Sequence, residues 1–302
     1  MDPRRLRDIE RWLNQYAART SELTARSELA VVAPYRRVSD WYSPDQTIAA
    51  ALAAATAAAT TRQLMAGLAG QFMAAVLFVL TGTRIRDSIR TPGRVREADP
   101  FAVYSRPIWT YRDTIALGGT DEQARIAATV RAEILAQMEG ILARAAAEAE
   151  QIDRAGVTHY RRVIRPELSG GNTCDLCAAA ATRLYRVGDL QPIHDRCRCT
   201  TLPVIGDQDP GRTLNATDLP APPSPSAVKV EQHSELGPIL VDPTTPKSTA
   251  RRRAAEAGAR AGRMEEVLAT LRARAAAGEP LSTQIAYSEE RIEQLRTLAQ
   301  AA

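Results

Sequence analysis

The chain has 302 residues, of which 45% are hydrophobic and 5% aromatic, and its formal net charge is +4 at pH 7. Much of the apolar fraction is alanine, which buries little area per residue, so this composition favours a modest helical core over a large layered one. The small net charge, with arginines and glutamates interleaved, excludes a strongly basic nucleic-acid binder. The opening MDPRRLRDIERW is charged and lacks an apolar segment, so we expect no secretory signal there.

The first eighty residues are dominated by helical spacing. Residues 1–30 carry apolar side chains on one face of a predicted first helix: Leu6, Ile9, Leu13 and Tyr16. Ser43 is suited to cap a second helix, with Pro44 at its first position. The alanine-rich run 48–60 continues this helix, and Gly82 is suited to end it.

Residues 63–83, QLMAGLAGQFMAAVLFVLTGT, contain no charged side chain. A membrane-spanning helix needs about 20 mostly apolar residues, a length that this segment reaches. Gln63, Gln71 and three glycines lower its hydrophobicity. We therefore interpret the segment as a helix buried among other helices, with a membrane-inserting helix as the alternative.

Residues 83–119 are predicted to be an irregular connector, because Pro-Gly, Asp-Pro and Gly-Gly pairs interrupt them. Trp109 and Tyr111 are expected to anchor it. The capping box 120–123 then opens a long helix that Gly156 ends. We interpret the apolar stripe of this helix as core packing: Ile126, Val130, Ile134, Met138, Ile141 and Leu142.

A small α+β module is predicted from about residue 155 to 205. The segment VTHYRRVI is suited to a strand, residues 178–183 to a short helix, and residues 184–187 and 199–205 to further strands. His159, on the first strand, and His233 have no predicted role.

Residues 206–247 are rich in proline, which indicates an extended linker. Residues 248–302 are predicted to form two helices separated at 278–280, as a helical hairpin or coiled-coil arm. The predicted fold is therefore mainly α. It comprises a helical region 1–119, a cysteine-containing α+β module 120–205, the linker 206–247 and the C-terminal helices 248–302.

All four cysteines lie between residues 174 and 199, together with one of the three histidines. Two short ligand pairs separated by a loop are typical of a structural zinc site, and zinc would stabilise a module too small to be held by burial alone. Two disulfides or reactive thiols are the alternatives. Zinc has four ligand positions, and the segment offers five candidate ligands: Cys174, Cys177, His194, Cys197 and Cys199.

The order of residues around these cysteines resembles the phage Mu F-like minor head proteins, also called phage head morphogenesis proteins. The match is strongest to the versions found in tailed phages of actinobacteria, and it covers about residues 120–205. Asp195 departs from the pattern, because a proline often follows the motif histidine. The resemblance rests on these residues: Tyr160, Arg161, Gly170, Gly171, Thr173, Cys174, Cys177, Ala181, Tyr185, Pro192, Ile193, His194, Cys197, Cys199 and Pro203.

This resemblance implies assembly rather than catalysis. Such proteins are minor virion components that associate with the portal protein and enter the prohead with scaffold and major capsid protein. We expect packaged DNA as a further partner, a part in genome delivery, and no small-molecule substrate. We accordingly expect location in the virion head, assembly in the host cytoplasm, and no enzyme activity. Residues 206–302 are too short for the toxin domain that some members carry.

Two other functions compete with this interpretation. One is a capsid maturation protease, for which His194 is the only serious candidate for a general base. The other is an injection protein that contacts membrane or DNA, which the uncharged residues 63–83 and the basic balance permit.

Overall fold

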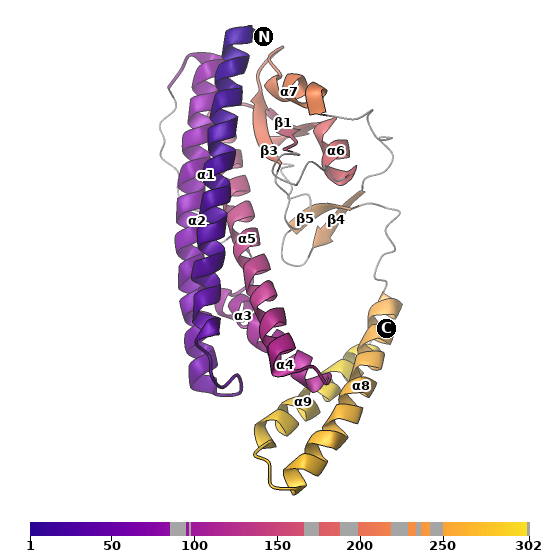
Figure 1. The fold of residues 1–302 in the computed structure, drawn as a ribbon. Helices are drawn as coiled ribbons and strands as arrows, with labels where there is room; N and C mark the ends of the chain where they lie inside the picture. The colour runs from indigo at the N-terminus through magenta and orange to yellow at the C-terminus, as the bar shows by residue number, and fades with distance from the viewer. Residues whose placement is uncertain are drawn as a thin grey trace. The chain divides into compact units, whose positions relative to one another are not determined.

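The computed structural model describes residues 1–84, 95–96, 98–165, 175–187, 199–218, 229–233, 237–241 and 250–300. The fold is mainly helical, as predicted (Figure 1). It divides into two compact units. Unit 1 contains residues 1–29, 56–99 and 136–245, and unit 2 contains residues 30–55, 100–135 and 246–302. The four-part division along the chain stays a prediction.

Three long helices contribute to both units: α1 (Pro3–Arg36), α2 (Pro44–Thr81) and α5 (Asp121–Arg154). The sequence predicted the ends of α2 and α5, whereas α1 extends to Arg36, past the predicted residues 1–30. The backbone N–H of Gln46 points to Ser43 Oγ at 3.5 Å, and Gly82 follows α2 with a φ of 72°. At the start of α5, Thr120 and Gln123 each donate a backbone N–H to the other's side chain, at 2.9 and 3.2 Å, which is the predicted capping box.

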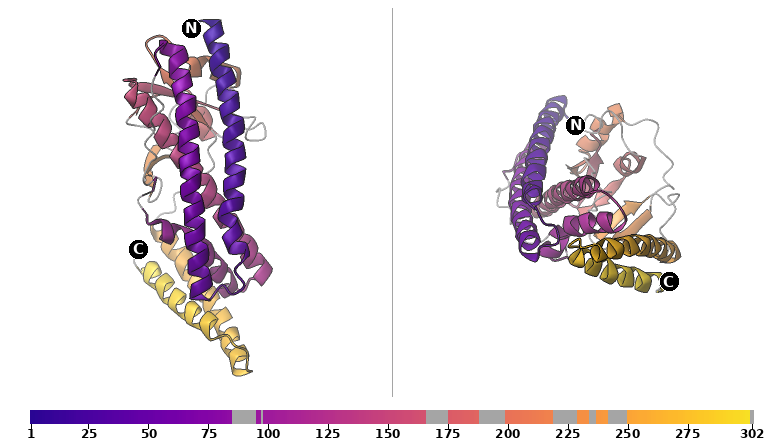
Figure 2. Two further views of the ribbon diagram at one scale, coloured as in Figure 1. Left: turned by 90° about the vertical axis from the view of Figure 1, so that its left-hand side faces the viewer. Right: turned by 60° about the horizontal axis from the view of Figure 1, so that its bottom comes forward.

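Within unit 1, α1 and α2 run antiparallel side by side (Figure 2), and two contacts fix their register. The rings of Tyr16 and Phe72 stack with centroids 4.2 Å apart. Eleven residues further along each helix, in opposite directions, the Thr61 hydroxyl donates to Ser27 Oγ at 2.7 Å. The main apolar core of unit 1 lies along this pair and the C-terminal part of α5 and includes Ile9 and Met73, both fully buried.

A three-stranded antiparallel sheet completes the described core of unit 1. Strand β1 (His159–Val163) lies between β2 (Leu184–Arg186) and β3 (Thr200–Val204). Tyr160 pairs with Tyr185 on one side and with Pro203 on the other. Helix α6 (Asp175–Ala181) precedes β2 and begins earlier than predicted, and α7 (Pro210–Asp218) follows β3.

Two expectations about irregular segments are corrected. Part of the predicted linker is α7, and another part is a separate hairpin of β4 (Lys229–His233) and β5 (Gly237–Val241). Part of the predicted connector is α3 (Pro100–Tyr104) and α4 (Arg106–Ala116). Two of the prolines that suggested interruptions, Pro100 and Pro210, are the first residues of α3 and α7, where a missing N–H costs nothing.

Unit 2 contains α3, α4 and a C-terminal hairpin of α8 (Ala250–Ala276) and α9 (Ser282–Gln300). Tyr111 is an anchor as predicted, because its ring stacks on Trp41 with centroids 4.4 Å apart. The prediction for Trp109 is wrong, since 46% of this residue is exposed. The hairpin core combines one residue of α4 with apolar residues of α8 and α9: Ala116, Ala257, Ala261, Met264, Leu268, Ile292 and Leu295.

The prediction that the apolar stripe of α5 packs in the core is confirmed for only part of the helix. Met138 and Leu142 are buried, whereas Ile126 and Val130 are 57% and 42% exposed. The buried face at this end of α5 is instead a line of alanines at four-residue spacing: Ala124, Ala128 and Ala132. Alanine side chains are small and let a neighbouring helix approach closely. The prediction was wrong here because it assigned the larger apolar side chains to the inner face.

A buried carboxylate fixes the C-terminal hairpin to α4 in unit 2. Asp113 is 6% exposed. It accepts hydrogen bonds from the Tyr287 hydroxyl at 2.7 Å, from Arg260 Nη2 at 2.7 Å and from Arg291 Nε at 3.2 Å. Three side chains of α8 and α9 therefore depend on one acceptor of α4.

We expect Asp113→Ala to lower the free energy of unfolding by about 2–3 kcal/mol, because it leaves two guanidinium groups and a hydroxyl without their acceptor. The loss is less than for a fully buried pair, since the arginines are partly exposed. Denaturant unfolding measures it. Glu289→Ala is the control, because it breaks the exposed 2.7 Å pair with Arg272 and should cost at most about 0.5 kcal/mol. Equal losses in both variants would contradict this role of Asp113.

Candidate functional site

Two of the five predicted ligands come together in unit 1. Cys177 on α6 and Cys199 just before β3 are each 6% exposed and belong to one small apolar cluster with Ile164, Ala180 and Ala181. They form no disulfide with each other. The other three predicted ligands lie outside the described residues: Cys174, His194 and Cys197.

The prediction of a zinc cofactor is corrected. Among the residues that the structure describes, no three His, Cys, Asp or Glu side chains form a group that could hold a metal ion. Tetrahedral zinc requires four ligands, and the two described thiols are packed instead among Ile164 and alanines. Hydrogen bonds and ion pairs around the sheet stabilise the described part of the module.

Glu148 is the central group of this network. The residue is 1% exposed and lies on α5. Its Oε1 accepts the Tyr16 hydroxyl of α1 at 2.8 Å, and its Oε2 accepts the Thr201 hydroxyl of β3 at 2.5 Å. Arg144, one turn earlier on α5, has its Nε 3.7 Å from Oε1 and donates from Nη2 to the Cys199 carbonyl at 2.8 Å. One carboxylate therefore connects two helices and a strand.

The tyrosine in this network is kept protonated. Burial raises the pKa of Tyr16 well above its ordinary value, and the neighbouring Glu148 carboxylate raises this pKa further. Arg144 opposes the shift only in part. Tyr16 is thus a hydrogen-bond donor at every physiological pH, which suits a structural hydroxyl.

Arg161 of β1 fixes α7 to the sheet. Its Nε donates to Asp209 Oδ2 at 2.8 Å, and its Nη1 donates to the Ala181 carbonyl at 3.2 Å. Asp209 also accepts the backbone N–H of Arg212 at 2.9 Å, so it caps α7. A Cβ on Gly211 would lie 3.1 Å from the Arg161 side chain, so glycine permits this close approach.

Asn215 of α7 extends the hydrogen bonding of β1. Its Oδ1 accepts the backbone N–H of Ile164 at 3.1 Å, and its Nδ2 donates to the Arg162 carbonyl at 2.8 Å. The side-chain amide thereby acts like a neighbouring strand at the end of β1. With 2% of its surface exposed, Asn215 is a buried structural group.

Aromatic residues of the motif stack across the sheet. Tyr160, which is fully buried, lies with its ring centroid 5.3 Å from that of Tyr185. The Arg162 guanidinium lies 5.8 Å from the Tyr185 ring centroid. Burial raises the pKa of Tyr185, and Arg162 opposes this shift. The motif residues that the structure describes thus gather in one module, although Tyr160 and Pro203 are 43 positions apart.

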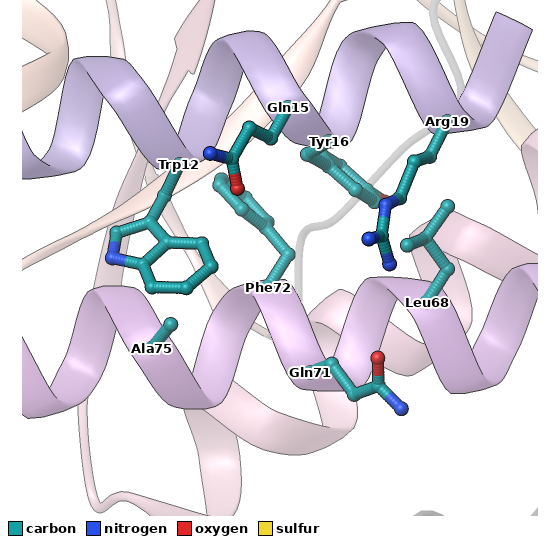
Figure 3. A pocket seen from close by; sticks show the side chains of 8 residues that line it. All are labelled: Trp12, Gln15, Tyr16, Arg19, Leu68, Gln71, Phe72 and Ala75. Atoms are coloured by element: carbon teal, nitrogen blue, oxygen red, sulfur yellow. The ribbon is translucent and has the colours of Figure 1, made fainter.

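A groove lies between α1 and α2 on the outer side of unit 1, with a volume of about 250 Å³ (Figure 3). Trp12, Gln15 and Arg19 of α1 line one side, and Leu68, Gln71 and Ala75 of α2 line the other. The stacked rings of Tyr16 and Phe72 complete the lining. No pattern in the sequence indicated this groove.

Helix α2 is long and apolar enough to cross a membrane, with a mean hydropathy of 2.0 over its most apolar 18 residues. Half of that window is buried in the fold. One face of α2 is therefore packed against other parts of the protein, as the interpretation as a buried helix requires, and the other face is not. Phe78 and Leu64 of the same segment are 45% and 53% exposed.

Comparison of the chain with protein-family models, curated proteins and solved structures found no match.

Four buried or partly buried polar residues of unit 1 were not predicted from the sequence. Glu148 and Arg144 were missed because an acidic and a basic residue four positions apart on a helix normally form a solvent-exposed pair. Asn215 and Asp209 were missed because they lie in a stretch that was interpreted as linker. An Asp-Pro pair is a recognisable helix start, so Asp209-Pro210 was the one available signal.

We expect Glu148→Gln to lower the free energy of unfolding by about 1–3 kcal/mol, because an amide replaces an acceptor that serves two hydroxyl donors and a nearby guanidinium. Chemical denaturation followed by circular dichroism measures this loss. A variant as stable as the parent chain would show that the network around Glu148 contributes nothing net.

A substitution at Gln151, on the same helix, is expected to raise the free energy of unfolding instead of lowering it. It is fully buried, and its side-chain amide makes no hydrogen bond to any residue that the structure describes. Gln151→Met keeps the length of the side chain and removes the desolvated amide, so unfolding should become about 1–3 kcal/mol less favourable. The same denaturation assay checks this. A destabilised variant would indicate that the amide has a buried partner after all.

Proposed function

We propose that the chain is a structural minor component of a tailed-phage head, which associates with the portal vertex during prohead assembly. One observation supports this above the others. The described residues that carry the resemblance to phage Mu F-like minor head proteins belong to one module, in which Tyr160 stacks on Tyr185 and Cys177 shares a cluster with Cys199.

The proposed role is architectural rather than enzymatic. The polar motif side chain of Arg161 is used inside the module, where it binds Asp209 and the Ala181 carbonyl, and the neighbouring Arg162 lies over the Tyr185 ring. The thiols of Cys177 and Cys199 are buried. Side chains placed in this way hold a shape that a partner surface recognises.

The proposed partners are the portal protein and the scaffold or major capsid protein, with contact to packaged DNA at the vertex. The protein would assemble in the host cytoplasm and stay in the virion head. The proposal extends to genome delivery, in which the chain would leave the head together with the DNA.

The proposal predicts that the chain is present in proheads and mature particles of the phage that encodes it, at few copies per head. Quantitative mass spectrometry of purified particles measures this. Absence from both particle types would overturn the proposal. Cleavage of the major capsid precursor by the purified chain would favour the maturation protease instead.

A binding assay tests the module itself. Portal rings purified from the same phage should retain the full chain in co-sedimentation, and Arg161→Ala should weaken retention at least tenfold because it releases α7 from β1. Arg186→Ala is the matched control, since this arginine is exposed on β2. Equal retention of the two variants would show that the module does not shape the portal contact.

A further inference from the structure

The outer faces of α1 and α2 in unit 1 form a surface that nothing else in the described part of unit 1 covers. The left view of Figure 2 shows the two helices side by side on this face. Trp12, Leu64 and Phe78 are 39%, 53% and 45% exposed, and the 250 Å³ groove lies between the helices. Exposed apolar groups of this size beside a groove indicate an interaction site.

The chemistry of the α2 face restricts its occupant. From Gln63 to Thr81 it has no charged side chain, so the cations that a phosphate backbone requires would come from α1 alone, where Arg11 and Arg26 are paired with Asp8 and Glu22. Exposed Gln63 and Gln71 make insertion into lipid costly. An occupant with small, uncharged side chains, such as another helix of this type, meets neither obstacle.

We propose that this surface binds the same surface of a second copy of the chain, around a twofold axis that passes α2 at Gln71. Leu64 and Phe78 are each seven positions from Gln71, so antiparallel α2 helices place Leu64 opposite Phe78 of the second copy. Gly67 comes opposite Ala75, which lets the backbones approach. The two Gln71 amides meet at the axis, and each is both a donor and an acceptor.

The charges of α1 supply a second, separate indication of the same symmetry. Asp8 and Arg11 form an exposed pair at 2.8 Å, and Glu22 and Arg26 form another at 2.5 Å. Antiparallel α1 helices centred on Ala17 place Asp8 opposite Arg26 of the second copy, and Arg11 within one position of its Glu22. A parallel arrangement would instead place like charges opposite each other.

The two centres coincide in the structure. The Tyr16–Phe72 stack and the Ser27–Thr61 hydrogen bond fix the antiparallel register of α1 and α2, and this register places Ala17 level with Gln71. A single twofold axis therefore satisfies the size pattern of α2 and the charge pattern of α1 at once. Isologous packing requires this agreement, because one axis must serve the whole interface.

The available area is sufficient for a specific dimer. About 20 residues of each helix span about 30 Å, and two adjacent helices are about 20 Å wide. The face thus offers about 600 Å² per copy, or about 1,200 Å² in total, at the low end of specific interfaces. The product is a four-helix arrangement in which each helix lies beside its own copy.

Cross-linking of the full chain tests the axis. With glutathione disulfide as oxidant, Gln71→Cys should give a covalent dimer through a disulfide between the two introduced thiols, while two glutathione thiols are released. Gln63→Cys is the matched control on the same helix, because its two copies lie about 24 Å apart across the proposed axis. Peptide mass spectrometry identifies the bond and separates it from links through native cysteines.

A charge exchange tests the register. Arg26→Glu should weaken dimerisation at least tenfold, as measured by analytical ultracentrifugation over a concentration series. Adding Asp8→Arg should restore it. Positions 8 and 26 are about 27 Å apart within one helix, so only a contact between copies explains such a rescue.

The proposal is overturned if the parent chain stays monomeric throughout the series, if Gln63→Cys cross-links as well as Gln71→Cys, or if the double charge variant is no better than the single one. Flotation of a monomeric chain with neutral phosphatidylcholine vesicles would also overturn it, because it would assign the face to lipid.

Discussion

The buried carboxylate of Glu148 is the interaction on which the organisation of unit 1 depends. Glu148 lies on α5, and its carboxylate accepts hydrogen bonds from the hydroxyl groups of Tyr16 on α1 and Thr201 on β3. Such a group is costly to bury unless its acceptor positions are used, and here hydroxyl groups of α1 and β3 use them. Because Arg144 binds both this carboxylate and the Cys199 carbonyl, the network also positions the backbone at Cys199, just before β3.

This arrangement changes the interpretation of the cysteine motif. The sequence suggested a small module that needed a metal to hold it together. In the described residues, the module is held by Arg161 on Asp209, by Asn215 on β1 and by stacked tyrosines. These contacts connect β1 to α7 and to β2.

Sequence patterns predicted what local chemistry controls. The caps at Ser43 and Thr120 and the left-handed glycine at 156 marked helix ends correctly. Prediction failed where tertiary packing decides. The inner face at the N-terminal end of α5 is alanine rather than Ile126 and Val130, and prolines at 100 and 210 begin helices instead of breaking them. The Glu148 network was not predictable, because its partners are 132 and 53 positions away.

Hydrogen exchange followed by mass spectrometry tests most directly whether Glu148 joins the sheet to the helices. We compare peptides from α1 around Tyr16 and from β3 in the parent chain and in Glu148→Gln. Both peptides should lose protection together in the variant, by the same factor, because one carboxylate stabilises both. Loss of protection in β3 alone, with α1 unchanged, would contradict this coupling.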